Sequence, residues 1–397
     1  MRSSSLAPST LTHLECSSTG KTYDADHLYT VAPDSGRPLL ARYDLAKAAQ
    51  TLSLESLRDR PRSMWRFAEV LPVQDPRFRV TLGEGATPLQ HCPRLGEELG
   101  LSRLFIKDES CNPTGTFKAR GMSAAVSRAL ELGAEHVTVP TTGNAGAAIA
   151  AYAARAGLKA HVVMPRDASE AVQGQVRACG AELILVDGLI SDAGKVVAEA
   201  CATQGWVSIG TLKEPYRVEG KKTMGYELWE DFDGKLPDVI LYPTGGGTGF
   251  IGIWKAFDEL QAMGLIDDHR PRMIVVQAEG CAPVVKAFHD GAEKTEFWQG
   301  ASTLAGGIRV PDTFADDLIL KVARESHGGA VAVQDEHIWR SMHHIAATEG
   351  IDPCPEGAAT FAALELMLES GDISKDETVV LFNCGTGLKH PDLRPTG

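Results

Sequence analysis

Basic residues are outnumbered in this 397-residue chain, which has 39 Lys and Arg against 52 Asp and Glu and a formal net charge of −13. Nucleic acids and anionic membranes are bound by basic faces, so this balance argues against both partners. No apolar run approaches the roughly 18 residues that span a bilayer, and residues 1–12 lack the apolar block of a signal peptide. We therefore expect a soluble, cytoplasmic protein.

Paired cysteines are also lacking. The eight cysteines are scattered along the chain, and none of them belongs to a CxxC pair. This pattern is more typical of a reduced cytosolic chain than of a disulfide framework or a cysteine-rich zinc site. No repeat of fixed period and no low-complexity tract is present.

Short β-branched runs alternate with Ala-rich helical runs from about residue 79 onward, which predicts βαβ units and mainly parallel sheets. We expect an α/β fold with two parallel-sheet lobes, preceded by an irregular segment over 1–75 with one short helical stretch near 44–57. The predicted strands are 104–107, 136–139, 160–164, 182–186, 206–209, 239–242, 273–277, 330–333 and 378–382. The predicted helices are 117–132, 144–156, 169–178, 191–204, 215–229 and 249–263.

Loops between strands and helices bind ligands in open parallel sheets, and the first unusual loop is Asn112–Lys118. It places Lys118 in the first turn of a helix, where a positive charge is disfavoured by about 0.3–1 kcal/mol. A solvated surface lysine is one interpretation. The other is functional, because a helix N-terminus helps to keep an amine neutral, as a Schiff base requires.

The second loop contains Thr141, Thr142 and Asn144, whose hydroxyl and amide groups suit an anionic ligand. A plain N-capping turn is the alternative interpretation. The third loop is glycine-rich, which costs conformational entropy and is typical of phosphate binding at a helix N-terminus. It matches neither the Walker A pattern nor the dinucleotide fingerprint, and a tight strand–helix turn remains the alternative. Its residues are Gly245, Gly246, Gly247, Thr248 and Gly249.

The fourth loop places Cys384 at a strand end before Gly385, where its thiol could face a ring, although a buried small side chain is equally compatible. An amine, an amide, an anion cup and a small polar atom together are what pyridoxal phosphate requires. These motifs resemble the threonine synthase family of tryptophan-synthase-β-like (fold type II) pyridoxal-phosphate enzymes over roughly residues 79–392. The resembling segments are 83–89 (GEGATPL), 107–109 with 112–118 (KDE, NPTGTFK), 141–145 (TTGNA), 214–223 (EPYRVEGKKT) and 385–389 (GTGLK).

The resemblance implies a role for each motif. Lys118 would form the Schiff base with pyridoxal 5'-phosphate and Asn144 would meet the phenolic oxygen of that cofactor. The glycine loop would hold the cofactor phosphate and Cys384 would face the pyridine nitrogen. Thr141 and Thr142 would meet the substrate carboxylate. Arg217 and Lys222 would bind the substrate phosphate, although Lys222 could equally be a solvated lysine on a helix face.

The activity implied is conversion of O-phosphohomoserine and water to L-threonine and phosphate. Two departures from the family pattern keep alternatives open, because Glu214 replaces a usual Asn and Cys384 replaces a usual Thr. One alternative is a threonine or serine dehydratase, or a β-replacement enzyme, on the same fold. The other is a non-catalytic descendant that binds the cofactor or an amino acid. Arg217 favours the synthase, because elimination of phosphate needs a cationic pocket.

The domain organisation follows the same resemblance. We expect a large cofactor-binding domain from 76–119 and 214–392, and a small mobile domain from 120–213. Residues 1–75 resemble a degenerate zinc ribbon that keeps only Cys16, so we expect no metal. The fold is often dimeric, and Trp65, Arg66 and Phe67 are expected to pack on a neighbouring subunit of a possible homodimer.

Overall fold

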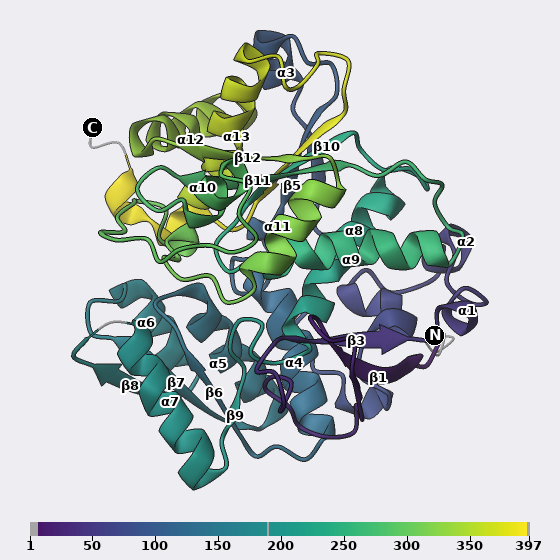
Figure 1. Ribbon diagram of the computed structural model, residues 1–397, viewed down its shortest axis with the longest axis vertical. Helices are drawn as coiled ribbons and strands as arrows, with labels where there is room; N and C mark the ends of the chain where they lie inside the picture. The colour runs from purple at the N-terminus through teal and green to yellow at the C-terminus, as the bar shows by residue number, and fades with distance from the viewer. Residues whose placement is uncertain (1–6, 189, 395–397) are drawn as a thin grey trace.

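The computed structural model describes residues 7–188 and 190–394, whose strands form three sheets (Figure 1). The large sheet has the order β12-β11-β10-β13-β5-β4, and all neighbouring pairs are parallel except β4 with β5. Its strands are β4 (Leu89–His91), β5 (Leu104–Asp108), β10 (Val239–Pro243), β11 (Arg272–Ala278), β12 (Gly329–Val333) and β13 (Val379–Asn383). The small sheet is parallel with the order β8-β7-β6-β9. Its strands are β6 (His136–Pro140), β7 (Lys159–Pro165), β8 (Glu182–Val186) and β9 (Val207–Ser208).

Helices cover the two parallel sheets, which confirms the predicted α/β architecture with two lobes (Figure 1). Beside the small sheet lie α4 (Lys118–Glu131), α5 (Asn144–Ala156), α6 (Glu170–Ala178) and α7 (Ile190–Gln204). The remaining longer helices are α3 (Pro93–Leu99), α8 (Arg217–Asp231), α9 (Thr248–Ala262), α10 (Pro283–His289), α11 (Asp316–Glu325), α12 (Asp335–Glu349) and α13 (Pro355–Glu369). The distribution of strands between the sheets is compatible with the predicted domains, whose boundaries stay a prediction.

Successive side chains of strand β10 point to opposite faces of the large sheet, and both faces are buried. Ile240 and Tyr242 join the hydrophobic cluster that contains the apolar side chains of α8 and α9. Val239 and Leu241 point the other way and join the cluster that contains those of α12 and α13. The large sheet is therefore the middle layer of a three-layer lobe, and only its ends are free to hold a site.

The N-terminal segment is more regular than its sequence predicts. Strands β1 (Leu11–Cys16), β2 (Thr22–Tyr23) and β3 (Leu39–Tyr43) form an antiparallel sheet in the order β2-β1-β3. The strands are short and β1 pairs with β3 across a long connection, so no hairpin pattern announces them. Two short helices, α1 (Leu45–Ala48) and α2 (Leu54–Arg58), follow where a helical stretch was expected. The β1 and β3 side chains share a cluster with apolar residues of α4 and α5.

The expectation that Trp65, Arg66 and Phe67 pack on another subunit is wrong, because all three are buried within the chain. The Trp65 indole donates to Glu84 and Ser123, and Arg66 pairs with Glu230. Among the described residues, no helix has the length and apolar character to cross a bilayer.

Candidate active site

Three of the four loops come from strands that are neighbours in the large sheet. Strand β13 lies between β10 and β5, and all three are parallel. The loops that follow them therefore meet at one edge of the sheet. The backbone N–H of Phe117 donates to the carbonyl of Cys384 over 3.0 Å, and Thr116 forms an antiparallel bridge with Gly385. Lys118 and Cys384 are thereby brought together from positions 266 residues apart in the sequence.

The motif around Lys107 and Glu109 anchors the loop that carries Lys118. Lys107 is fully buried and pairs with Asp231 at 2.7 Å. Glu109 accepts two hydrogen bonds of 2.7 Å from the guanidinium of Arg120, which lies one half-turn beyond Lys118 in α4. Removing one partner from such a buried pair is strongly destabilising, so these charges fix where α4 begins.

Lys118 is a weaker base than an ordinary lysine. Its side chain is partly buried, and burial together with the positive charge of Arg217 lowers the pKa of Lys118 to about 8. Its Nζ lies 3.8 Å from the centroid of the Phe117 ring. About a tenth of the amine is therefore unprotonated at pH 7, much more than at the ordinary lysine pKa of 10.5, and covalent attachment to an aldehyde requires this form.

The glycine-rich loop after β10 presents a row of unsatisfied donors. The backbone N–H groups from Gly245 to Phe250 have no acceptor in the described part of the chain. Close packing also demands the glycines, because a Cβ on Gly246 would lie 2.7 Å from the Thr211 side chain and one on Gly249 only 1.8 Å from the Tyr242 hydroxyl. Successive free N–H groups at the start of α9 form a cup for an anion.

Arg217 lies next to this cup with incomplete hydrogen bonding. Its side chain is 2% exposed, and Nη1 donates over 3.2 Å to both the Ile209 carbonyl and the Thr211 hydroxyl. The Nε of Arg217 has no partner among the described residues. Thr211 also packs against Gly246, so the guanidinium sits at the rim of the glycine cup. A buried cation with a free donor there is suited to a second anion.

Glu214 performs a structural task that an Asn could also perform. Its carboxylate accepts hydrogen bonds from the backbone N–H groups of Tyr216 and Arg217, over 2.8 and 2.6 Å, and so satisfies the start of α8. Burial raises the pKa of Glu214 to about 7. The departure from the family pattern therefore leaves this turn intact but adds a titratable group behind Arg217.

The loop after β6 supplies the opposite wall from the small lobe. Asn144 opens α5, and its Oδ1 accepts a hydrogen bond of 3.0 Å from Lys389, five residues beyond Cys384. The backbone N–H groups of Asn144 and Ala145 find no acceptor in the described chain. The Thr141 hydroxyl accepts from the N–H of Gly143, and Thr142 is exposed.

Cys384 is a buried, neutral thiol. It is 6% exposed, and burial raises its pKa to about 12. The hydroxyl of Tyr242 is also buried and has no hydrogen-bond partner in the described structure, although the two groups interact electrostatically. A buried donor without an acceptor costs free energy. A ligand that accepts a hydrogen bond from the Tyr242 hydroxyl would remove this cost.

The structure does not bring Lys222 to the site. Its Nζ is fully buried between Glu219 at 2.6 Å and Glu259 at 2.9 Å, on the face of α8 that packs against α9. Neither the phosphate-binding role nor the solvated position expected for Lys222 agrees with this placement. Arg217, five residues earlier on α8, lies on another side of that helix, because a step of five residues rotates the side chain by about 140°.

Three further residues that motif reasoning did not select lie in the site. Tyr242 could have been found, since it ends a strand just before the glycine loop. Glu356 accepts a hydrogen bond of 2.6 Å from the N–H of Gly307, whose carbonyl abuts Gly245, and its charge acts on Lys118. Lys389 stands out in the sequence only as the last residue of the motif at 385–389, which assigns it no role. Glu356 had no sequence signal, because its position depends on the distant segment around Gly307.

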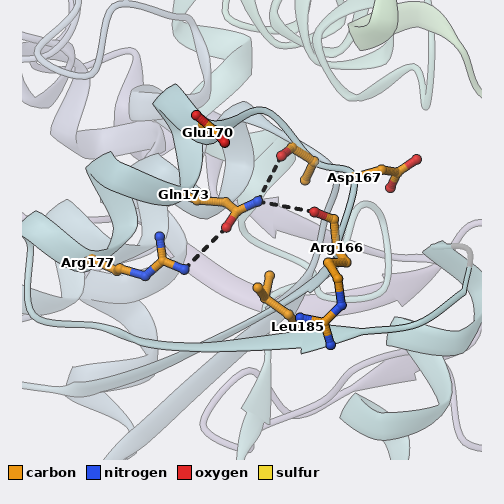
Figure 2. Close-up of a pocket in the computed structure, with 7 residues that line it drawn as sticks. Arg166, Asp167, Glu170, Gln173, Arg177 and Leu185 are labelled. Carbon is orange, nitrogen blue, oxygen red and sulfur yellow. Dashed lines mark hydrogen bonds between the residues drawn. The ribbon is translucent and has the colours of Figure 1, made fainter.

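A separate hollow of about 630 Å³ opens on the small lobe, and Figure 2 shows its lining. None of the predicted site residues contributes to it. It lies between the loop after β7, helix α6 and strand β8, and its lining residues are Arg166, Asp167, Ala168, Glu170, Gln173, Arg177 and Leu185.

Comparison with known proteins gives one consistent result. Residues 80–385 match the family model described as pyridoxal-phosphate dependent enzyme. Threonine synthase from Methanocaldococcus jannaschii is 38% identical over 379 residues, 95% of this chain and 93% of its own length. Threonine synthase from Mycobacterium tuberculosis is 35% identical over 82% of this chain and 88% of its own. The Escherichia coli diaminopropionate ammonia lyase structure superposes with a TM-score of 0.68, covers 98% of this chain and 97% of its own, and at 16% identity shows only the fold.

Proposed function

The chain belongs to the threonine synthase family of pyridoxal-phosphate-dependent enzymes, and we infer that it converts O-phosphohomoserine and water to L-threonine and phosphate. It is a pyridoxal-phosphate-dependent lyase. The observation that supports the phosphorylated substrate most directly is the buried guanidinium of Arg217, whose Nε has no acceptor and which lies at the rim of the glycine cup.

The residues present fit pyridoxal 5'-phosphate. The free N–H groups of Gly245–Phe250 suit the cofactor phosphate, and Lys118 offers an amine whose lowered pKa favours a covalent link. Cys384, with its pKa raised to about 12, stays neutral and suits an unprotonated pyridine nitrogen. The bound cofactor withdraws electrons from the Cα of the attached amino acid.

Each side chain then has a defined task. With substrate bound, the Lys118 amine would act as the base that takes the proton from Cα and would give a proton back later in the reaction. The N–H groups of Asn144 and Ala145, with the hydroxyls of Thr141 and Thr142, hold the substrate carboxylate. A neutral thiol at Cys384 does not enforce a charged ring, which favours elimination over transamination.

Arg217 holds the phosphate while it leaves from Cγ. Its free Nε points to an unfilled contact, and a planar guanidinium binds phosphate through two parallel hydrogen bonds. Lys222 takes no part in this contact, because its ammonium group is already paired with the carboxylates of Glu219 and Glu259.

A dehydratase that acts on threonine or serine is the second candidate, and Cys384 is the feature that favours it. Its leaving group is a hydroxyl, which needs a proton donor and gives a buried guanidinium no partner. We further propose that the protein is cytoplasmic and forms homodimers. Its eight free cysteines agree with a reducing compartment, and the homodimer rests on the family resemblance alone.

Two variants test the proposal. Lys118→Ala should lose the visible absorption of the cofactor–lysine link, and a variant that retains it would refute the assignment of Lys118. Arg217→Gln should lower kcat/KM for phosphate release from O-phosphohomoserine by about 10- to 150-fold, equivalent to a charged hydrogen bond of about 1.5–3 kcal/mol. Arg77→Gln changes an exposed arginine and serves as the control.

The same assay separates the candidates. Wild-type protein should release phosphate from O-phosphohomoserine and yield threonine, with little keto acid from threonine or serine. Keto acid formation with the higher kcat/KM, unchanged in Arg217→Gln, would establish the dehydratase instead.

A further inference from the structure

One side chain of the C-terminal segment connects the two lobes. Lys389 ends the short 3-10 helix Gly387–Lys389 that follows strand β13 of the large sheet. Its Nζ donates to Oδ1 of Asn144 and to Oε1 of Gln175, each over 3.0 Å. Asn144 begins α5 and Gln175 lies in α6, and both helices belong with the small sheet. A single ammonium therefore joins elements that lie more than 200 residues apart.

The stem of Lys389 also touches the loop that carries Lys118. A Cβ on Gly115 would lie 3.3 Å from Cε of Lys389, and Gly115 has a left-handed φ of +70°. The C-terminal segment thus packs across the Asn112–Lys118 loop before its amine reaches the small lobe. Lys389 touches both sides of the site and the loop at its base.

The chemistry of an ammonium fixes the orientation of the Asn144 amide. An amide side chain can be turned by 180° at little cost, which exchanges its oxygen for its NH₂ group. Lys389 can only donate, so it selects the orientation in which Oδ1 faces Nζ. The Asn144 NH₂ group then points elsewhere, and it has no acceptor in the described structure. It is left as a donor.

Helix α6 is held firmly enough to transmit this contact. Figure 2 shows that Gln173, two residues before Gln175, donates to the backbone carbonyls of Arg166 and Ala168 and accepts from Arg177. These bonds tie α6 to the loop after β7. The hydrogen bond between Lys389 and Gln175 therefore connects to the small lobe as a whole, and not to helix α6 alone.

We propose that Lys389 is a positioning residue that orients the Asn144 amide toward the cofactor and latches the small lobe onto the large lobe through Gln175. The inference rests on the proposed function, in which Asn144 contacts the cofactor. Lys389 has no carboxylate within ion-pair distance in the described chain, and burial lowers its pKa to about 8. Its partners are two neutral oxygens, so the contact consists of hydrogen bonds without an ion pair.

The test compares four variants of the cofactor-loaded enzyme. Lys389→Met keeps the stem and removes the donors, and Lys389→Arg keeps both donors and charge. Gln175→Leu removes only the hydrogen bond between Lys389 and α6. Leu388→Ala changes the neighbouring side chain, which is 77% exposed, and is the matched control. Hydrogen exchange of the segment 166–178 reports the latch, and absorption spectra with kcat/KM report the cofactor and the reaction.

Lys389→Met should keep the visible band of the Lys118-linked cofactor but shift its maximum, speed exchange over 166–178, and lower kcat/KM by about 10- to 100-fold. Gln175→Leu should speed exchange equally, with an unshifted band and a smaller loss of activity. Lys389→Arg should restore most of the activity and the slow exchange, and Leu388→Ala should match wild type.

Unchanged exchange in both Lys389→Met and Gln175→Leu would overturn the latch. An unshifted band with wild-type kcat/KM in Lys389→Met would overturn the orientation of Asn144. A wild-type protein that takes up no cofactor would instead refute the proposed function, and the exchange measurement separates the two failures because it does not require turnover.

Discussion

Replacing Lys222 with Met should destabilise the protein without weakening substrate binding. Lys222 and Lys255 alternate with Glu219 and Glu259 in a buried square whose four N–O distances lie between 2.6 and 2.9 Å. The hydroxyls of Tyr43 and Tyr226 donate further hydrogen bonds to Oε2 of Glu219 and Oε2 of Glu259, while Oε1 of Glu219 has no hydrogen-bond partner among the described residues. The square is neutral as a whole.

Removal of one lysine leaves a net negative charge away from water. Breaking a buried pair in this way costs about 3–5 kcal/mol, and we expect the lower end because Lys255 still contacts both carboxylates. Urea unfolding followed by circular dichroism measures the change. Lys222→Met with Glu219→Gln restores neutrality and should recover part of the loss. Lys321→Met, at an exposed ion pair, should cost less than about 1 kcal/mol.

Kinetic measurements on Lys222→Met decide between a structural role and a phosphate-binding role for Lys222. The KM for O-phosphohomoserine should stay within a factor of about two of wild type, since a tenfold change needs about 1.4 kcal/mol of lost binding. A variant that unfolds at the wild-type urea concentration but has a KM raised tenfold would refute the structural role and restore phosphate binding to Lys222.

Two further changes test the neighbourhood of the cup. The pKa of Glu214 is raised from 4.5 to about 7, so its protonation stabilises the fold fully below pH 4.5, and this stabilisation is lost as the pH rises through 7. Glu214→Gln should abolish a fall of about 3 kcal/mol in unfolding free energy between pH 5 and 8; identical pH profiles would contradict this. Gly249→Ala puts a Cβ against Tyr242 and should weaken cofactor binding at least about tenfold in an absorbance titration. Gly194→Ala meets nothing within 4 Å and should bind the cofactor normally.

Much of the fold was readable because local signals agreed with the tertiary structure. The strand at 182–186 and the helix at 144–156 have the predicted bounds, since each begins after a glycine or turn and has a consistent periodicity. The antiparallel N-terminal sheet was missed because β2 has only two residues and β3 pairs with β1 across more than twenty residues. No pattern within a short window encodes such a contact.

The site residues differ in the same way: local sequence indicates some of them, and others depend on contacts between distant segments. That Lys118, the glycine cup and Cys384 lie near one another could be predicted, because each occupies a loop at the end of a parallel strand. Their roles stay predictions. Lys222 was misplaced because its neighbour Glu259 comes from α9, and a single motif on α8 does not show which of its faces that helix covers. Glu356 depends on packing against the distant segment around Gly307, so only the structure identifies it.

The energetics of Arg217 explain why a phosphorylated substrate suits this site better than an alcohol. A guanidinium that is 2% exposed has lost most of its hydration, and one of its donors has no acceptor among the described residues. Burial lowers its pKa, and the charge of Glu214 counteracts that effect. With a pKa of about 7, however, Glu214 is only partly ionised at neutral pH and compensates the cation incompletely. A departing hydroxyl would leave this imbalance in place, whereas a phosphate supplies both the missing acceptor and the missing charge.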